Sequence, residues 1–178
     1  MQPTPINFQP DNLGDDLVKL LPLEAANYDG LYAVAADPLL WEQHPASDRY
    51  KPEVFRSFFD AAIDSGTAFL IVEATTNMII GTTRFYDYIP QTSSIAIGYT
   101  FLMRECWGGG YNMAVKKNLL NYIFNFIDNV YFHVGSQNFR SQIAVKRLGA
   151  TKVREYNSET NGIPFISFEY LLIKNNWI

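Results

Sequence analysis

A chain of 178 residues that is 48% hydrophobic and 18% charged can bury one substantial core, which indicates a soluble, globular protein. The net charge of −4, with basic residues scattered along the chain, argues against a nucleic-acid-binding protein. No run approaches the roughly 18 apolar residues of a membrane helix, and the amino-terminal segment lacks the pattern of a signal peptide. We therefore expect a cytoplasmic protein without a membrane partner.

The residue types that form disulfides and metal sites are scarce. Cys106 is the single cysteine, so no internal disulfide can form, and His44 and His133 are far apart in the sequence. No metal site is expected. Cys106 has no histidine placed by sequence to activate it, which favours a small structural residue over a nucleophile. His133 lies in a predicted strand and is interpreted as a hydrogen-bonded core histidine.

Two helices are predicted in the first third of the chain. They span residues 24–36 and 52–64 and are separated by a long loop with Pro, Asp and Ser punctuation. Trp41, His44 and Tyr50 lie in this loop.

Three strands with short connections follow. Residues 67–75, 78–88 and 93–102 are rich in β-branched and aromatic side chains, and the "TN" and "PQTS" turns between them favour an antiparallel meander. In the third strand, Ile95, Ile97, Tyr99 and Phe101 alternate and are predicted to share one face.

The clearest helix begins after three glycines, near Tyr111. Its apolar residues recur at helical spacing and are Val115, Leu119, Tyr122, Ile123 and Phe126. Its polar residues are expected to face elsewhere, and they are Lys116, Lys117, Asn118, Asn121 and Asn125.

The remaining elements complete the predicted topology. Residues 130–136 indicate a buried strand, and residues 138–148 a helix that Asn138 could cap and Gly149 could close. Residues 150–157 and 164–174 indicate a terminal hairpin around Asn161–Gly162. The central strand–helix–strand unit predicts one parallel pair with a right-handed crossover. The expected architecture is a single α/β domain over residues 1–178, with a mixed, mostly antiparallel sheet of six or seven strands flanked by helices.

The three consecutive glycines, Gly108, Gly109 and Gly110, indicate a possible ligand site. They lie between a strand ending at Leu102 and the helix opening near Tyr111. Unpaired N–H groups and the helix dipole favour an anion there, most naturally a phosphate or pyrophosphate. The alternative is a plain glycine turn. The sequence matches neither the P-loop nor the dinucleotide-binding signature.

Two segments resemble the signatures of a known family. "IGYTFLMRECWGGGYNMAVKKNLLNYIF" looks like the cofactor strand, pyrophosphate loop and following helix of the GNAT superfamily of N-acetyltransferases. "NFRSQIAVKRLGA" looks like the second signature of its subgroup similar to ribosomal-protein N-terminal acetyltransferases. The superfamily pattern of Gln or Arg, two residues, Gly, one residue, then Gly or Ala falls on Trp107, Gly110 and Asn112. The first and last of these depart from it.

The resemblance implies a splayed pair of central parallel strands and a site for acetyl-coenzyme A. Main-chain groups of the loop and helix start would bind the phosphates, and the strand end would bind the pantetheine arm and hold the thioester carbonyl against a main-chain N–H. The implied cofactor-binding residues are Thr100, Phe101, Leu102, Gly108, Gly109, Gly110, Tyr111, Asn112, Met113 and Asn138.

The catalytic groups are less defined by the resemblance. Ser141 matches a serine proposed in the subgroup to protonate the leaving sulfur, although it also fits an ordinary helix residue. Asn138 could bind pantetheine, cap its helix, or do both. Glu73, Glu105 and Glu169 are candidates for the base, and their spacing selects none. Trp41, His44 and Tyr50 occupy the region that lines the acceptor channel in the family, or they pack as a lid over the core.

Two functions are consistent with these observations. The first is an acetyl-coenzyme A-dependent N-acetyltransferase whose acceptor is the primary amine of a protein N-terminus or a small molecule. The second is a noncatalytic acyl-coenzyme A-binding or interaction module with the same fold. The expected partners are acetyl-coenzyme A and an amine acceptor, and a homodimer is an open possibility.

Overall fold

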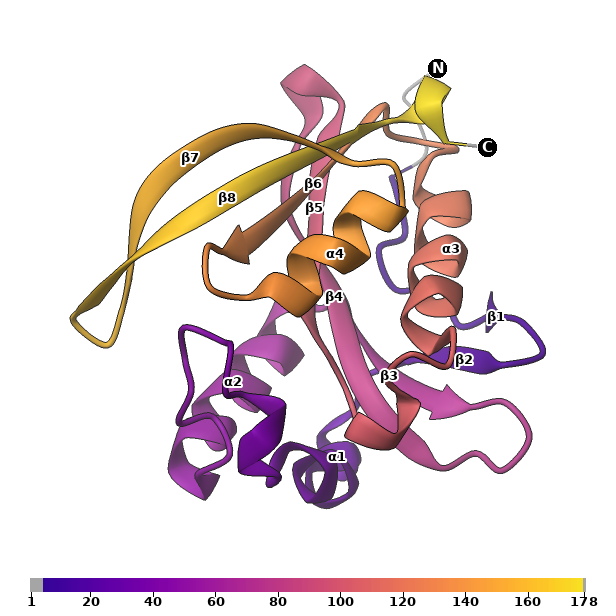
Figure 1. Cartoon of the computed structure of the whole chain (residues 1–178). Coiled ribbons are helices and arrows are strands. Elements are labelled where there is room, and N and C mark those ends of the chain that lie inside the picture. Colours follow the sequence, from indigo (N-terminus) through magenta and orange to yellow (C-terminus); the bar gives the residue numbers. More distant parts are fainter. Residues whose placement is uncertain (1–4, 178) are drawn as a thin grey trace.

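The computed structural model describes residues 5–177, in which eight strands form one sheet of order β1-β2-β3-β4-β5-β6-β8-β7 (Figure 1). The strands are β1 (Leu13–Gly14), β2 (Val18–Pro22), β3 (Ala68–Glu73), β4 (Ile79–Ile89), β5 (Ser94–Leu102), β6 (Asn129–Gly135), β7 (Thr151–Thr160) and β8 (Ile163–Ile173). The α-helices are α1 (Tyr28–Ala35), α2 (Pro52–Ser65), α3 (Tyr111–Ile123) and α4 (Phe139–Arg147).

The mixed, mostly antiparallel sheet confirms the predicted fold class. It has one strand more than the upper bound of the prediction, because the short amino-terminal strands β1 and β2 both pair at its edge. The first helix begins at Tyr28, later than predicted, because Ala25–Asn27 form a 3-10 turn before it. The terminal hairpin forms as expected: Asn161 and Gly162, at its tip, have φ of 51° and 76°, which suit a tight hairpin turn.

Two hydrophobic cores lie on opposite faces of the sheet. One contains Val115 and Leu119 of α3 and Val145 of α4, packed against the side chains of six strands. The other contains Leu31 of α1 and Phe55 of α2. Helices α3 and α4 therefore cover one face and α1 and α2 the other. Within residues 5–177, no helix is both long enough and apolar enough to cross a membrane.

A β-bulge in β5 changes the predicted face of that strand. The register with β4 moves from Arg84↔Gly98 to Thr82↔Phe101, so β5 contains one extra residue over this interval. Tyr99 there has φ of 51° and is 40% exposed. The prediction that four alternating residues share one face was wrong: Ile95 and Ile97 lie in the α3–α4 core, whereas Phe101 lies in the α1–α2 core.

The predicted parallel pair is present and short. Strands β5 and β6 pair at Ser94↔Asn129, Ile95↔Val130 and Ala96↔Tyr131, and α3 makes the crossover between them. The rest of β5, from residue 97 to Leu102, does not pair with β6. The two strands therefore separate towards the carboxyl end of β5, where the bulge also lies.

Lys116 was predicted on the exposed, polar face of α3, but it is buried. It is 5% exposed, whereas Phe126, which was expected on the buried stripe, lies beyond the end of α3 and is 47% exposed. Lys116 stands one helical turn before Leu119 and Leu120, so its aliphatic stem continues the buried stripe. Its amine is accommodated because it reaches hydroxyl groups of the sheet.

Candidate active site

The glycine-rich loop presents bare main chain at the start of α3. Gly108 and Gly110 have φ of 76° and 84°, and a Cβ atom at Gly108 would meet no other atom within 4 Å. Backbone conformation, rather than crowding by protein atoms, therefore requires glycine here. No side chain caps α3, and its first intrahelical bond runs from the N–H of Ala114 to the carbonyl of Gly110. The preceding N–H groups of the first turn lack intrahelical acceptors and can bind an anion.

Trp107 fixes this loop against the end of β5 and against α4. Its indole Nε1 donates to the carbonyl of Leu102 at 3.0 Å. The guanidinium of Arg140, from the first turn of α4, lies 4.0 Å from the centroid of the Trp107 ring. Arg140 also forms an ion pair with Glu42 at 3.1 Å. The tryptophan that departs from the superfamily pattern thus positions the loop and brings a positive charge beside it.

The other residues expected at the cofactor lie at the strand end and in the first turn of α3. Phe101 and Leu102 are buried, and Thr100 between the bulge and Phe101 is half-buried. The hydroxyl of Tyr111 donates to Glu73 at 2.8 Å, which ties the start of α3 to β3. Asn112 is half-buried and Met113 is exposed.

Asn138 and Ser141 lie together at the start of α4. The Oδ1 atom of Asn138 accepts a hydrogen bond from the backbone N–H of Ser141 at 3.2 Å, which confirms the predicted cap. Ser141 is half-buried. Within residues 5–177 its hydroxyl has no hydrogen bond to another side chain that would occupy it.

A chain of hydrogen-bonded side chains crosses the sheet on the face of α1 and α2. The Tyr86 hydroxyl lies 2.8 Å from Nδ1 of His133, and Nε2 of His133 lies 3.0 Å from Oε2 of Glu169. Arg154 donates to the same carboxylate oxygen at 3.0 Å. His133 and Glu169 are direct partners on β6 and β8, and Arg154 and Glu169 on β7 and β8. Burial raises the pKa of the Tyr86 hydroxyl, with smaller contributions from Tyr99 and Asp87.

This chain of contacts distinguishes among the three candidate glutamates. Glu169 belongs to it, whereas Glu73 accepts hydrogen bonds from Thr76 and Tyr111, and Glu105 is exposed beside the glycine loop. His133 is hydrogen-bonded at both ring nitrogens, as expected of a satisfied histidine. Sequence reasoning missed Tyr86 because it lies 47 positions before His133.

Lys116 approaches the bulged segment from the other face. Its Nζ donates to Oγ1 of Thr100 at 2.6 Å and lies 3.5 Å from Oγ1 of Thr83. Burial lowers the pKa of this amine to about 7. No carboxylate among residues 5–177 lies within 4.0 Å of it. The side chain holds Thr100 in place on the part of β5 that no longer pairs with β6.

The three residues expected to line an acceptor channel are packed into the loop that precedes α2. Trp41 is 2% exposed, donates from Nε1 to the carbonyl of Ala35 at 2.8 Å, and belongs to the α1–α2 core. His44 accepts at Nδ1 from the N–H of Ala46 at 2.9 Å. Burial, followed by the charge of Arg49, lowers the pKa of His44 to about 3. Tyr50 is half-buried against the same core.

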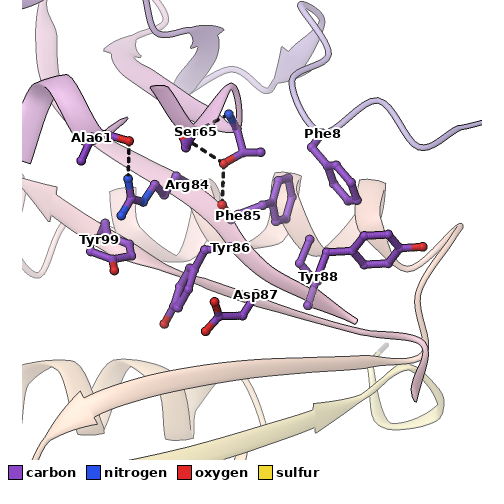
Figure 2. A pocket seen from close by; sticks show the side chains of 11 residues that line it. Phe8, Ala61, Ser65, Arg84, Phe85, Tyr86, Asp87, Tyr88 and Tyr99 are labelled. Carbon is purple, nitrogen blue, oxygen red and sulfur yellow. Dashed lines mark hydrogen bonds between the residues drawn. The ribbon is translucent and has the colours of Figure 1, made fainter. Parts of the chain in front are cut away.

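A shallow depression of about 470 Å³ lies along β4 and reaches Tyr99 at the bulge (Figure 2). Its polar lining includes Arg84, Tyr86, Asp87 and Tyr99, and Phe8 and Tyr88 lie at its other end. The guanidinium of Arg84 lies 3.5 Å from the centroid of the Tyr99 ring and donates to the carbonyl of Ala61 at 3.0 Å. Tyr86 therefore lines the depression and also belongs to the Tyr86–His133–Glu169 contacts.

Residues 18–151 match the family model described as an acetyltransferase (GNAT) domain. This match spans more than half of the chain, so the chain belongs to the GNAT acetyltransferase family. No curated protein matches the sequence significantly.

Solved structures of acetyltransferases share the fold at low sequence identity. The microcin C7 self-immunity acetyltransferase MccE, in complex with acetyl-CoA and AMP, has a TM-score of 0.76 and 16% identity, with 94% of this chain and 98% of that chain covered. Spermidine N-acetyltransferase from Vibrio cholerae, in complex with CoA and spermine, has a TM-score of 0.71 and 14% identity, with 91% and 98% covered. A structure assigned to a ribosomal-protein-serine acetyltransferase from Vibrio cholerae has a TM-score of 0.75 and 15% identity, with 93% and 99% covered.

Proposed function

We propose that this protein transfers an acetyl group from acetyl-coenzyme A to a primary amine by direct attack. The observation that carries the proposal is the separation of β5 from β6 after Ala96, with an exposed glycine loop directly after β5. A pantetheine arm needs an unpaired strand edge, and a pyrophosphate needs free N–H groups at a helix start. Here both features lie along one continuous segment, from Thr100 to Met113.

The chain's own groups fit each part of the cofactor. Main-chain N–H groups from Gly108 to Met113 would bind the phosphates, and the charge of Arg140 would assist them. Main-chain groups of Thr100, Phe101 and Leu102 would bind the pantetheine arm. Beside the bulge, a main-chain N–H would stabilise negative charge on the thioester oxygen as the amine attacks.

The arrangement also suggests how the amine loses a proton and how the departing thiolate gains one. The amine nitrogen forms a bond to the acetyl carbon as the carbon–sulfur bond breaks. We assign the amine proton to Tyr86, whose own proton passes to Nδ1 of His133 while Glu169 stabilises the resulting imidazolium. Ser141 would donate a proton to the departing thiolate and regain one from solvent, to which His133 releases its proton. Asn138 orients the main chain on which Ser141 lies.

The test is cofactor binding followed by product analysis. Acetyl-coenzyme A should bind in a calorimeter, and Gly110→Val should abolish binding with little change in the circular-dichroism spectrum. A valine there is strained, because residue 110 has φ of 84°. Gly66→Val is a matched control, since Gly66 has φ of 60° and ends α2 far along the chain from the loop. Unchanged binding by the Gly110 variant would contradict the site.

Turnover distinguishes an enzyme from a noncatalytic binding module. A panel of amines and peptides should be incubated with acetyl-coenzyme A and examined by mass spectrometry for a gain of one acetyl group. Tight binding of acetyl-coenzyme A with no acetylated product and no thiol release would favour the binding module.

A further inference from the structure

Two guanidinium groups near Tyr99, at the bulge, have no carboxylate partner in the described part of the chain. Neither Arg49 nor Arg84 has a carboxylate oxygen within 4.0 Å among residues 5–177, although six other basic groups do. The Nε atom of Arg84 is buried and has no hydrogen-bond partner there. An unsatisfied charged donor is costly in a folded protein, which points to a group that the isolated chain lacks.

Aromatic rings hold the two arginines near one another. The guanidinium of Arg49 lies 4.6 Å from the centroid of Phe58, and that of Arg84 lies 3.5 Å from the centroid of Tyr99. The Phe58 and Tyr99 rings are themselves neighbours, with centroids 6.2 Å apart. Burial lowers the pKa of Arg49 to about 10, and the charge of Arg84 contributes to the lowering. Tyr99 and Asp48 act on the pKa of Arg49 in the opposite direction.

The position of Arg84 relates this charge to the reaction site. Arg84 pairs with Gly98 beside the bulge and lies on β4 two residues before Tyr86. Two residues of a strand span about 7 Å. The Tyr99 ring stands between them, 5.0 Å from the ring of Tyr86 and beneath the Arg84 guanidinium.

A negative charge lies near Tyr86, about 7 Å along β4 from Arg84. Asp87 lines the same depression beside Tyr86, and Figure 2 shows its carboxylate next to the Tyr86 ring. A carboxylate and a tyrosine oxygen at one end suit an ammonium group. A guanidinium pair at the other end suits an anion, since Arg binds carboxylate and phosphate through paired donors.

We propose that the acceptor is an amine that also carries a carboxylate or phosphate a few bonds away, and that Arg84 and Arg49 bind this anionic group. The inference rests on the proposed acetyl transfer and narrows its acceptor class. A free amino acid, a phosphorylated amino alcohol and an acidic peptide N-terminus all carry this chemistry. Polyamines do not.

The experiment compares three matched pairs of acceptors with acetyl-coenzyme A. They are methionine and methioninamide, phosphoethanolamine and ethanolamine, and the tetrapeptide amides Ser-Asp-Ala-Ala and Ser-Asn-Ala-Ala. We expect the anionic member of at least one pair to have the lower KM, and the pair that responds identifies the source. Arg84→Gln should raise that KM about 10- to 100-fold, in line with loss of a charge-assisted contact, and should leave the neutral member unchanged.

Two further variants test whether the anion preference depends on these two guanidinium groups. Arg84→Lys should restore binding in part, because it keeps the charge but loses the paired donors. Arg49→Met should raise the same KM while keeping an apolar side chain against Phe58. Arg56→Gln is the control, because Arg56 on α2 is exposed and already paired with Asp60 at 3.1 Å. Thermal melts would confirm that each variant is folded.

Binding is measured separately so that turnover is not the only readout. Calorimetric titration of the same six compounds into protein saturated with coenzyme A should show the anionic preference and its loss in Arg84→Gln. Equal affinity for both members of every pair, or a preference for the neutral members, would overturn the inference while leaving acetyl transfer intact. Failure to bind coenzyme A would instead contradict the proposed function.

Discussion

Tyr86 on β4 and His133 on β6 meet at 2.8 Å across β5, the strand that separates them in the sheet. The crossing is possible because β5 carries Gly98 at this position. A Cβ atom built on Gly98 would lie 2.8 Å from the Tyr86 ring and 3.1 Å from its hydroxyl. The glycine therefore has a specific function in the geometry: it provides the room through which two non-neighbouring strands make contact.

The Gly98→Ala variant should break this contact. The added methyl group must displace the ring of Tyr86, because protein atoms rarely approach within 3.0 Å of a Cβ. Nitrogen-15 NMR of the histidine rings should show a changed His133 signal, and His44→Gln would identify which signal is His133. An unchanged His133 spectrum would show that Tyr86 and His133 do not interact through this opening.

Removal of the Tyr86 hydroxyl alone should test the proposed proton route. Tyr86→Phe keeps the ring packing against Tyr99, and His133→Gln removes the group that receives the proton. Both should lower kcat/KM about 10²- to 10⁴-fold, the usual contribution of general acid–base catalysis.

A neighbouring tyrosine provides the control for that experiment. Tyr131 lies two residues before His133 on β6 and is half-buried on the same face. Tyr131→Phe should retain nearly full activity. A loss of activity as large as that of Tyr86→Phe would mean that hydroxyl groups on this face act through folding rather than proton transfer.

Ser141→Ala should lower kcat more than it weakens binding of acetyl-coenzyme A. The cap survives, because Asn138 accepts from the backbone N–H of residue 141 rather than from its hydroxyl. A thiolate is a tolerable leaving group, so we expect a loss of about 10²-fold in kcat, at the low end for acid catalysis. Single-turnover kinetics and calorimetry separate the two effects. Equal turnover would return Ser141 to an ordinary helix residue, and weakened binding would assign it to cofactor recognition.

Lys116→Met should stabilise the protein near neutral pH. Burial lowers the pKa of Lys116 to about 7 from its ordinary value of 10.5. At pH values between about 7 and 10.5, Lys116 is protonated in the unfolded chain but not in the folded chain. The contribution of Lys116 to the free energy of unfolding therefore rises with pH. The contribution is complete above about pH 10.5 and is lost as the pH falls towards about 7.

The measurement is the difference in urea stability between wild type and Lys116→Met at several pH values. The variant should be more stable by about 4 kcal/mol at pH 7, and the difference should shrink towards pH 10. Lys117→Met serves as control, because Lys117 is exposed and its effect should not change with pH in this way. A difference that stays constant from pH 7 to pH 10 would contradict the low pKa of Lys116.

The sequence by itself determined the order of the elements and the position of the glycine loop. Strand and helix periodicities are local, and the glycines at 108–110 mark a change from one to the other, so the parallel pair and its crossover helix were predictable. The Asn138 cap was predictable for the same reason, because the bond joins residues three positions apart. The resemblance to the acetyltransferase family is local too, since each of its two signatures is one short, continuous stretch of residues.

Only the tertiary structure decided which side chains meet at the site. The bulge at Tyr99 depends on pairing between β4 and β5, and it moves Phe101 into the other core, which alternation alone cannot predict. The contact of Tyr86 with His133 depends on strand order and on the absence of a side chain at Gly98. Lys116 is buried because α3 docks its flank against Thr100, whereas its charge predicted exposure. In each case the deciding term is a contact between residues that are distant in the chain, and such contacts exist only once the sheet has formed.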